Sequence, residues 1–168
     1  MFPALDVSTS GLAAQRVRMN AISGNLAIIA RKESFAGAQY TSGRISTRTK
    51  FKQAYGRFEA RIKMPRGFGV WPAFWMLGVG CTPQLFSNGV CCNGNDGWPD
   101  CGEIDIVEMR GQEPTIIHGS LHGPGYSGAS PITKTVSLTA GRFDTEFHVF
   151  AIEWTEEGID YFLDDQMY

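Results

Sequence analysis

Residues 56–64 alternate strictly between apolar and charged side chains after the first glycine, in the order Gly-Arg-Phe-Glu-Ala-Arg-Ile-Lys-Met. Successive side chains of a β-strand point to opposite faces, so Phe58, Ala60, Ile62 and Met64 would face one way and the charged side chains the other. A period of two therefore predicts a strand that is buried on one face only. A chain that contains such a strand must build a sheet with one dry side and one wet side.

Short runs of the same kind recur along most of the chain, and turn signals such as Pro-Arg-Gly, Gly-Pro-Gly and Asp-Asp separate several of them. The 20 glycines, the 8 prolines and the 12% of aromatic residues suit many short strands joined by turns better than a helical bundle. The sequence therefore predicts an all-β fold, an antiparallel β-sandwich. The further strands are expected over residues 26–30, 40–47, 70–77, 103–109, 115–122, 147–154 and 159–163.

Residues 1–23 follow a different period, because Leu5, Leu12 and Met19 recur every seven residues. This spacing predicts one amphipathic helix. The segment also resembles the N-terminal helix of bacterial flagellar rod proteins. We therefore expect two parts, a flagellar-rod-like N-terminal helix over 1–23 and the sandwich over 24–168.

The net charge of −2 hides an uneven distribution, since residues 1–66 hold 12 of the 15 Lys and Arg residues but 3 of the 17 Asp and Glu residues. Most of these basic side chains alternate with apolar ones, as on the wet face of strands, and no nucleic-acid-binding motif accompanies them. Nucleic acid is therefore not expected as a partner.

No apolar run approaches the ~20 residues that span a bilayer, and the N-terminus lacks the layout of a secretory signal. The sequence makes no prediction of oligomeric state.

All the cysteines fall within one Gly-rich polar stretch, which predicts a long loop with local disulfides formed in an oxidising compartment. Three pairings are possible, and the sequence does not choose among them. A zinc site is disfavoured because the stretch lacks paired Cys-x-x-Cys arms that grip a tetrahedral ion. The cysteines are Cys81, Cys91, Cys92 and Cys101.

Three carboxylates lie within six residues in the segment Glu-Ile-Asp-Ile-Val-Glu. On a regular strand Glu103 and Asp105 share a face, whereas Glu108 has the wrong parity. A one-residue β-bulge re-aims side chains in this way beside active sites, so we predict a bulge at Ile106 to Val107. Like charges so close together cannot all ionise freely, and at least one carboxyl should stay protonated near neutral pH. Hydrolysis of a glycoside needs such a pair, one acid and one carboxylate.

The segment Gly-Glu-Ile-Asp-Ile-Val-Glu also matches the signature of glycoside hydrolase family 16, in the laminarinase-like branch where an extra residue precedes the last Glu. Blocks such as YGRFEARIKMPRG, WPAFWMLG and GSLHGPGYSG resemble successive blocks of bacterial endo-β-1,3-glucanases. The resemblance covers residues 24–168 and implies a jelly-roll, concanavalin-like sandwich, incomplete at both ends. It also implies an extracellular or periplasmic enzyme that needs no cofactor.

The family's catalytic roles can be carried onto the matching residues of this sequence. The resemblance implies that Glu103 is the nucleophile, that Asp105 assists it and that Glu108 is the general acid/base of a retaining double displacement. The implied substrate is a β-1,3-glucan of the laminarin type. Mixed-linkage glucan, agar and carrageenan stay open, because the signature is shared across the branch.

Aromatic and histidine side chains are candidates for binding this substrate. Trp71 and Trp75 share strand parity and could stack on sugar rings, or they could belong to the core. Trp98, in the loop before the carboxylate strand, is a similar candidate. His118 and His122 could face the same way, but two histidines without a third ligand make a poor metal site, so no metal is predicted. His122 is expected to hydrogen-bond to substrate or to a catalytic carboxylate.

Two other functions are open on the sequence alone. One is a non-catalytic glycan-binding sandwich in which the groove survives without turnover. The other is a flagellar rod-related chimeric protein that carries a glucanase-like passenger. Because absent family strands would expose apolar faces and unpaired backbone edges, we expect reduced stability in either case.

Overall fold

The computed structural model describes residues 26–48, 50–79, 81 and 97–168. The helix predicted over 1–23 and the boundary near residue 24 lie outside these residues. Every regular element within the described ranges is a strand, and none of their segments forms a helix long and apolar enough to cross a membrane. The strands are β1 (Arg31–Phe35), β2 (Ala38–Thr41), β3 (Gly56–Ile62), β4 (Ala73–Leu77), β5 (Glu103–Glu108), β6 (Ile116–His122), β7 (Ile132–Ser137), β8 (His148–Trp154), β9 (Ile159–Leu163) and β10 (Gln166–Met167).

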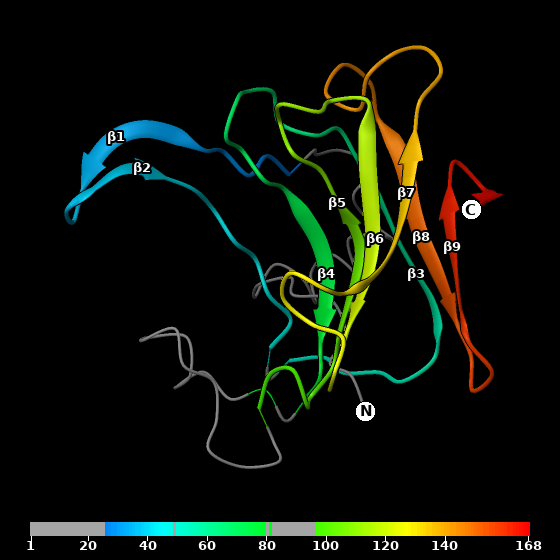
Figure 1. The fold of residues 1–168 in the computed structure, drawn as a ribbon. Coiled ribbons are helices and arrows are strands. Elements are labelled where there is room, and N and C mark those ends of the chain that lie inside the picture. The colour runs from blue at the N-terminus through cyan, green and yellow to red at the C-terminus, as the bar shows by residue number, and fades with distance from the viewer. Residues whose placement is uncertain (1–25, 49, 80, 82–96) are drawn as a thin grey trace.

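Two antiparallel sheets of four strands make up the body of the molecule (Figure 1). One sheet has the order β10-β9-β8-β3 and the other the order β4-β5-β6-β7, and every pairing is antiparallel. Strands β1 and β2 form a separate hairpin that projects away from both sheets in Figure 1. The predicted all-β antiparallel sandwich is therefore confirmed.

The core lies between the two sheets, and the alternation of strand residues explains which side chains fill it. In β3 the side chain of Phe58 is buried and Arg57 and Glu59 are exposed, as the period of two predicts. On the opposite sheet Ile104 and Ile106 of β5 point into the same space. The fully enclosed core consists of Phe58, Met64, Met76, Ile104, Ile106, Val107, Met109, Ile117, Phe143, Phe150, Ile152 and Trp154.

The hairpin differs from the predicted strands at both of its ends. Its turn at Ala36 and Gly37, both with positive φ, sets a ladder that runs only between residues 31 and 41. Residues 26–30 therefore lie beyond the ladder and form no strand, and the second strand stops at Thr41 instead of reaching residue 47. The predictions for 26–30 and for 42–47 were wrong, because an apolar run becomes a strand only when a partner strand is beside it.

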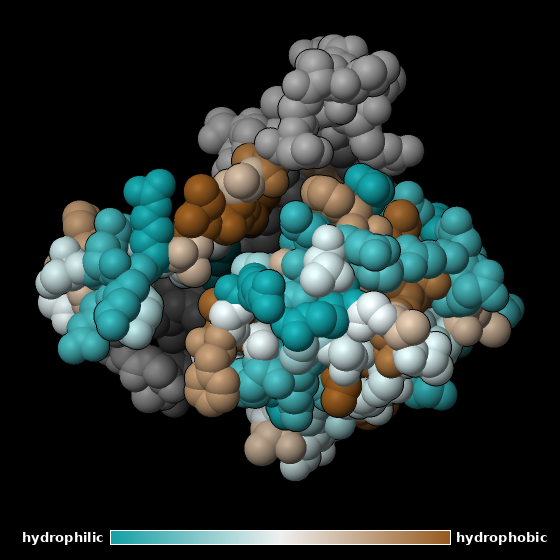
Figure 2. Space-filling view, turned by 90° about the horizontal axis from the view of Figure 1, so that it is seen from above, coloured by the Kyte–Doolittle hydropathy of each residue, from teal (hydrophilic) through white to brown (hydrophobic). Residues whose placement is uncertain are grey.

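Several apolar side chains of this region are exposed, and among the described residues no third strand pairs with the hairpin. Leu26 is 63% exposed and Phe35 is 68% exposed. Figure 2 shows the hairpin as a lobe set apart from the body, with hydrophobic surface where the two meet. The expectation that absent strands leave apolar faces exposed stays a prediction.

One further strand begins later than predicted, and two strands were not predicted at all. β4 begins at Ala73 rather than at residue 70, because Pro72 has no N–H to donate to the ladder. β7 was not predicted, since its side chains are mostly exposed and carry no clear alternation. β10 is only two residues long and also escaped prediction.

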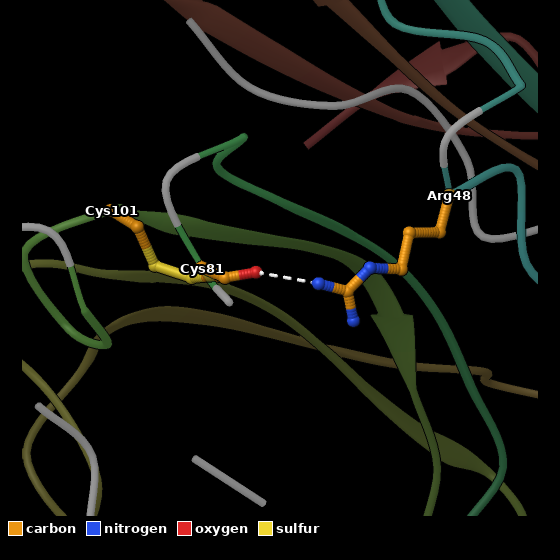
Figure 3. Close-up of a disulfide and its surroundings, with 3 residues drawn as sticks. All are labelled: Arg48, Cys81 and Cys101. Carbon is orange, nitrogen blue, oxygen red and sulfur yellow. Dashed lines mark hydrogen bonds between the residues drawn. A yellow bond between two sulfur atoms is a disulfide. The ribbon is translucent and has the colours of Figure 1, made fainter. Parts of the chain in front are cut away.

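A disulfide joins Cys81 to Cys101 and ties the end of β4 to the loop before β5 (Figure 3). The guanidinium of Arg48 donates a hydrogen bond to the carbonyl of Cys81, at 3.2 Å, in the same view. The prediction of a local disulfide is confirmed for this pair. Cys91 and Cys92 lie outside the described residues.

Candidate active site

The bulge predicted in β5 is present. On one side Phe74 of β4 pairs with Val107 and Trp75 pairs with Asp105, so that Ile106 is left over. On the other side Asp105 pairs with Ser120 and Glu108 pairs with His118, which leaves two residues of β5 opposite Gly119 alone. The bulge at Ile106 to Val107 is therefore confirmed.

The extra residue restores the parity of the last carboxylate. Cross-strand partners share a face of the sheet, so Glu103, Asp105 and Glu108 all lie on the face that bears His122, Ser120 and His118. Ile104 and Ile106 point the other way, into the core. The backbone of β5 thus gathers three carboxyl groups on the outer face of one sheet.

Burial changes the protonation of the central carboxyl group. Asp105 is only 2% exposed, whereas Glu103 and Glu108 are half-buried. The loss of solvent raises the pKa of Asp105 to about 9, with further contributions from the charges of Glu103 and Glu108 and from a hydrogen bond to Glu103. At neutral pH Asp105 therefore keeps its proton, as the crowding of carboxylates predicts.

The pKa of Glu108 is also raised, chiefly because the carboxyl group is partly buried. A hydrogen bond from the side chain of Trp71 opposes this rise, since it stabilises the ionised form. The indole of Trp71 is 63% exposed and lies next to the guanidinium carbon of Arg110, 5.7 Å from its ring centre. Trp71 lies outside β4, so it is not a strand residue as predicted, but it is not a core residue and it reaches the same carboxylate face as Trp75.

Trp75 is placed on the same face by its pairing with Asp105. Its ring is half-buried, and the guanidinium carbon of Arg44 lies 4.6 Å from the ring centre. The sequence left Arg44 out of the site, because its position next to Trp75 depends on a contact between residues far apart in the chain. The Thr-Ser-Gly-Arg-Ile block was the only signal that could have found it.

Trp98 lies near the N-terminal end of β5, where Glu103 pairs with His122. Its ring centre lies 5.8 Å from that of His122, and its buried indole Nε1 has no hydrogen-bond partner among the described residues. The loop that carries it is held by the disulfide at Cys101 and by a hydrogen bond from Gly78 N–H to the Gly102 carbonyl, at 2.9 Å. The loop therefore brings an aromatic side chain close to the His122 end of the site.

His122 contacts both a loop and a carboxyl group. The backbone N–H of Gly128 donates a hydrogen bond to Nδ1 at 3.2 Å. On the other side of the ring, Nε2 lies 3.1 Å from Oδ2 of Asp105. Oδ2 nevertheless has no formed hydrogen bond in the described part of the chain. His122 was expected to hydrogen-bond either to substrate or to a catalytic carboxylate. The carboxyl group of Asp105 lies within hydrogen-bond distance of its ring.

Glu103, Asp105 and His122 could in principle hold a cation, because one ligand atom from each lies within 4.8 Å of the others. The positions of the protons on His122 and Asp105 argue against a bound cation. Because Gly128 donates to Nδ1, the neutral ring carries its proton on Nε2, the atom that would have to bind the ion. Asp105 is protonated as well. His118 is not part of this group, and its Nδ1 instead bonds the hydroxyl of Thr135 at 3.0 Å.

The antiparallel jelly-roll-like sandwich carries on one sheet face a cluster of carboxyl groups, and a pair of such groups is what glycoside hydrolases use. The chain belongs to the glycosyl hydrolases family 16, whose model matches residues 12–168. The match begins inside the segment that resembles a flagellar rod helix, and no comparison supports that resemblance.

The names of similar proteins are consistent with this family. The chain is 43% identical over 145 residues to a beta-glucanase of Rhodothermus marinus, covering 86% of this chain and 47% of that protein. It is 38% identical over 135 residues to a glucan endo-1,3-beta-glucosidase of Cryptopygus antarcticus, covering 77% of this chain and 43% of that protein. The chain thus spans about half the length of these relatives.

Solved structures show the same fold. The structure of the catalytic domain of an endo-1,3-beta-glucanase (laminarinase) from Thermotoga petrophila is similar, with a TM-score of 0.73 and 34% identity. The similarity covers 99% of this chain and 69% of that chain.

Proposed function

We propose that this chain is the catalytic core of a retaining endo-glycosidase that hydrolyses β-1,3-glucan of the laminarin type. The observation that carries the proposal is the bulge in β5, which brings Glu103, Asp105 and Glu108 to one face. A strand without the bulge would keep the same residues but turn Glu108 towards the core. The names of the two relatives and of the Thermotoga structure, all glucanases or glucosidases, support the substrate class.

In the first step Glu103 attacks the anomeric carbon and the glycosidic bond breaks. Glu108 gives its proton to the departing sugar oxygen, and the upward shift of its pKa, caused chiefly by burial, favours the protonated form that this step needs. The product is a glycosyl ester on Glu103. In the second step Glu108, now ionised, takes a proton from water, and the water oxygen displaces Glu103 from the anomeric carbon. Both carboxyl groups return to their starting states.

The substrate would lie across the face that carries the three acids. Trp71 beside Glu108 and Trp75 beside Asp105 offer aromatic rings for stacking on sugars, and Trp98 offers a third ring near His122. Together they would line a path long enough for several sugar units, which suits cleavage within a chain. The assignment of these three tryptophans to the substrate is part of the proposal.

Release of reducing sugar from laminarin tests the proposal. The wild-type chain is expected to release sugar, and Glu103→Gln and Glu108→Gln are each expected to lose activity by at least a hundredfold, because each removes one required group. Glu156→Gln, at an exposed position, is the matched control and should retain activity.

An inactive wild-type protein that still migrates more slowly through a gel containing laminarin would favour the non-catalytic glycan-binding alternative. A panel of laminarin, mixed-linkage glucan, agar and carrageenan, with product analysis, resolves the linkage. Activity on agar alone would overturn the β-1,3-glucan assignment and leave the glycosidase assignment intact.

We also propose that the protein acts outside the cytosol. The disulfide between Cys81 and Cys101 supports this location, because disulfides persist in oxidising compartments. Labelling of free thiols in protein taken directly from its native source tests it. Both cysteines should resist labelling until a reductant is added, and full labelling without reductant would contradict the location.

A further inference from the structure

His122 lies between the loop that follows β6 and the carboxyl groups of β5. Its Nδ1 accepts the N–H of Gly128, and its Nε2 lies 3.1 Å from Oδ2 of Asp105. A neutral imidazole carries one proton, and the nitrogen that accepts a hydrogen bond cannot hold it. The backbone of the loop therefore selects the tautomer in which Nε2 bears the proton.

We propose that His122 is a positioning residue whose Nε2–H, fixed by the Gly128 backbone, makes Oδ2 the acceptor oxygen of Asp105, so that the hydroxyl of Asp105 faces Glu103. The tautomer part of this proposal rests on the geometry alone. Its consequence for catalysis rests on the proposed function, because it takes Glu103 as the nucleophile.

The environment of Asp105 supports this arrangement. The carboxyl group is almost fully buried, and Oδ2 has no formed hydrogen bond among the described residues. A buried oxygen without a donor is costly, and Nε2–H of His122 is within hydrogen-bond distance of it. A small rotation of the ring would direct the N–H at Oδ2. A protonated carboxyl group that accepts at Oδ2 keeps Oδ1 to carry the hydrogen.

The hydrogen of Asp105 then has an acceptor in Glu103. Hydrogen bonding to Glu103 is one of the causes that raise the pKa of Asp105, and a hydrogen bond between two carboxyl groups requires one of them to be protonated. The result is a chain of donors that runs in one direction, from Gly128 N–H through His122 and Asp105 to Glu103. The ring of Trp98 lies beside this chain, with its centre 5.8 Å from that of His122.

The direction of the chain has a consequence in the second step of the reaction. When water displaces Glu103 from the sugar, the departing carboxylate regains its negative charge. A hydroxyl of Asp105 that already faces Glu103 stabilises that charge without moving, which is the advantage of preorganised donors. No proton is transferred along the chain. Loss of the Nε2–H would leave Asp105 free to turn its hydroxyl away.

Nitrogen-15 NMR of the histidine rings tests the tautomer without any substrate. The full chain is labelled with ¹⁵N-histidine, and His122→Gln identifies the His122 signals by their disappearance. Near neutral pH we expect Nε2 of His122 to carry the hydrogen and Nδ1 to be bare. A ring with its hydrogen on Nδ1 would overturn the proposal, whatever the enzyme does with glucan.

Two substitutions test the positioning role. His122→Leu removes the donor, whereas the side-chain amide of His122→Gln can place an N–H near the position of Nε2. We expect His122→Leu to lower kcat about tenfold to a hundredfold, the effect of one hydrogen bond to an ionisable group, and to change KM less than about twofold. His122→Gln should recover most of the lost kcat.

Equal losses in the two variants, or a rise in KM with kcat preserved, would overturn the positioning role. The second result would mean that His122 contacts the substrate instead. If both variants fail to unfold cooperatively, the tautomer measured on the wild-type chain decides. A wild-type chain that hydrolyses no glucan would refute the proposed function while leaving the tautomer result valid.

Discussion

Asp105 shows how far one residue's surroundings can change its chemistry. The same side chain that ionises near 3.8 in a model compound stays protonated to about pH 9 here, because it is buried between two other carboxyl groups. The folded state therefore holds a proton that the unfolded chain has released. This difference couples the protonation of Asp105 to the stability of the whole fold.

The free energy of unfolding should depend on pH through Asp105. Between about pH 4 and about pH 9 the folded protein binds more protons than the unfolded chain, so stability falls as pH rises through this window. Asp105→Asn removes this titration. We expect the melting temperature of the variant, relative to wild type, to increase steadily as pH rises from about 5 to about 9.

Each pH unit in this window is worth up to about 1.4 kcal/mol of unfolding free energy. Thermal unfolding at a series of pH values measures the trend. Asp160→Asn, at an exposed position in β9, is the matched control and should show no such trend. A constant difference between Asp105→Asn and wild type across the series would contradict the buried, protonated carboxyl group.

At the scale of elements, the pairing of β5 with β6 is adapted to the bulge. Gly119 lies opposite Ile106 and Val107, and the ring of Tyr161 from the other sheet fills the space where a side chain would be. A Cβ added at Gly119 would lie 2.7 Å from that ring. The hydroxyl of Tyr161 also donates to the carbonyl of Ser120, at 3.1 Å, which fixes β6 behind the carboxylates.

Gly119→Ala should therefore destabilise the protein by about 1–3 kcal/mol, the usual cost of overpacking a filled interior. Denaturant unfolding measures it. Gly158→Ala is the matched control, because a Cβ there has nothing within 4 Å. Adding Tyr161→Leu to Gly119→Ala should recover part of the loss. Similar stabilities for the two single alanine variants would argue against close packing behind the bulge.

Local patterns predicted the elements whose side chains alternate between core and solvent. The sequence identified β3 by its period and the bulge in β5 by the conflict between that period and the position of Glu108. It missed β7, which is mostly exposed, and it assigned residues 26–30 to a strand although they pair with no strand among the described residues. Periodicity reports on burial, so an exposed edge carries little signal.

Some contacts of the candidate site could be predicted from the sequence and others could not. The carboxylates were predictable because their chemistry depends on residue type and spacing along one strand. The contact of Arg44 with Trp75 and the bond from Gly128 to His122 were not, since the first joins distant segments and the second comes from a backbone N–H. A backbone donor is present at almost every residue and leaves no mark in the sequence.

At the scale of the whole molecule, the loop that carries Trp98 is attached to the sandwich by a covalent bond. Cys81 and Cys101 are 20 residues apart and join the end of β4 to the entrance of β5. The bond therefore ties the segment that carries Trp98 to the end of β4. Figure 3 shows Arg48 from a third segment reaching the same point.

Replacing both cysteines by serine should lower the free energy of unfolding by about 3 kcal/mol, because a disulfide closing a loop of this length restricts the unfolded chain. Thermal unfolding with and without a reductant measures the effect. The reductant should lower the melting temperature of wild type more than that of the Cys81→Ser/Cys101→Ser variant. An equal response of both proteins would contradict a stabilising bond between these residues.

The bulge in β5 also bears on which changes of length this gene tolerates. Deleting the single codon for Ile106 would remove the extra residue and leave every acidic, aromatic and histidine residue of the site in the protein. On the shortened, regular strand Glu108 would stand four residues from Glu103 and share its face without a bulge. A search for inactive copies that counted every change in the spacing of the three acids as damage would discard such an allele wrongly, so the spacing has to be read together with the parity of the strand.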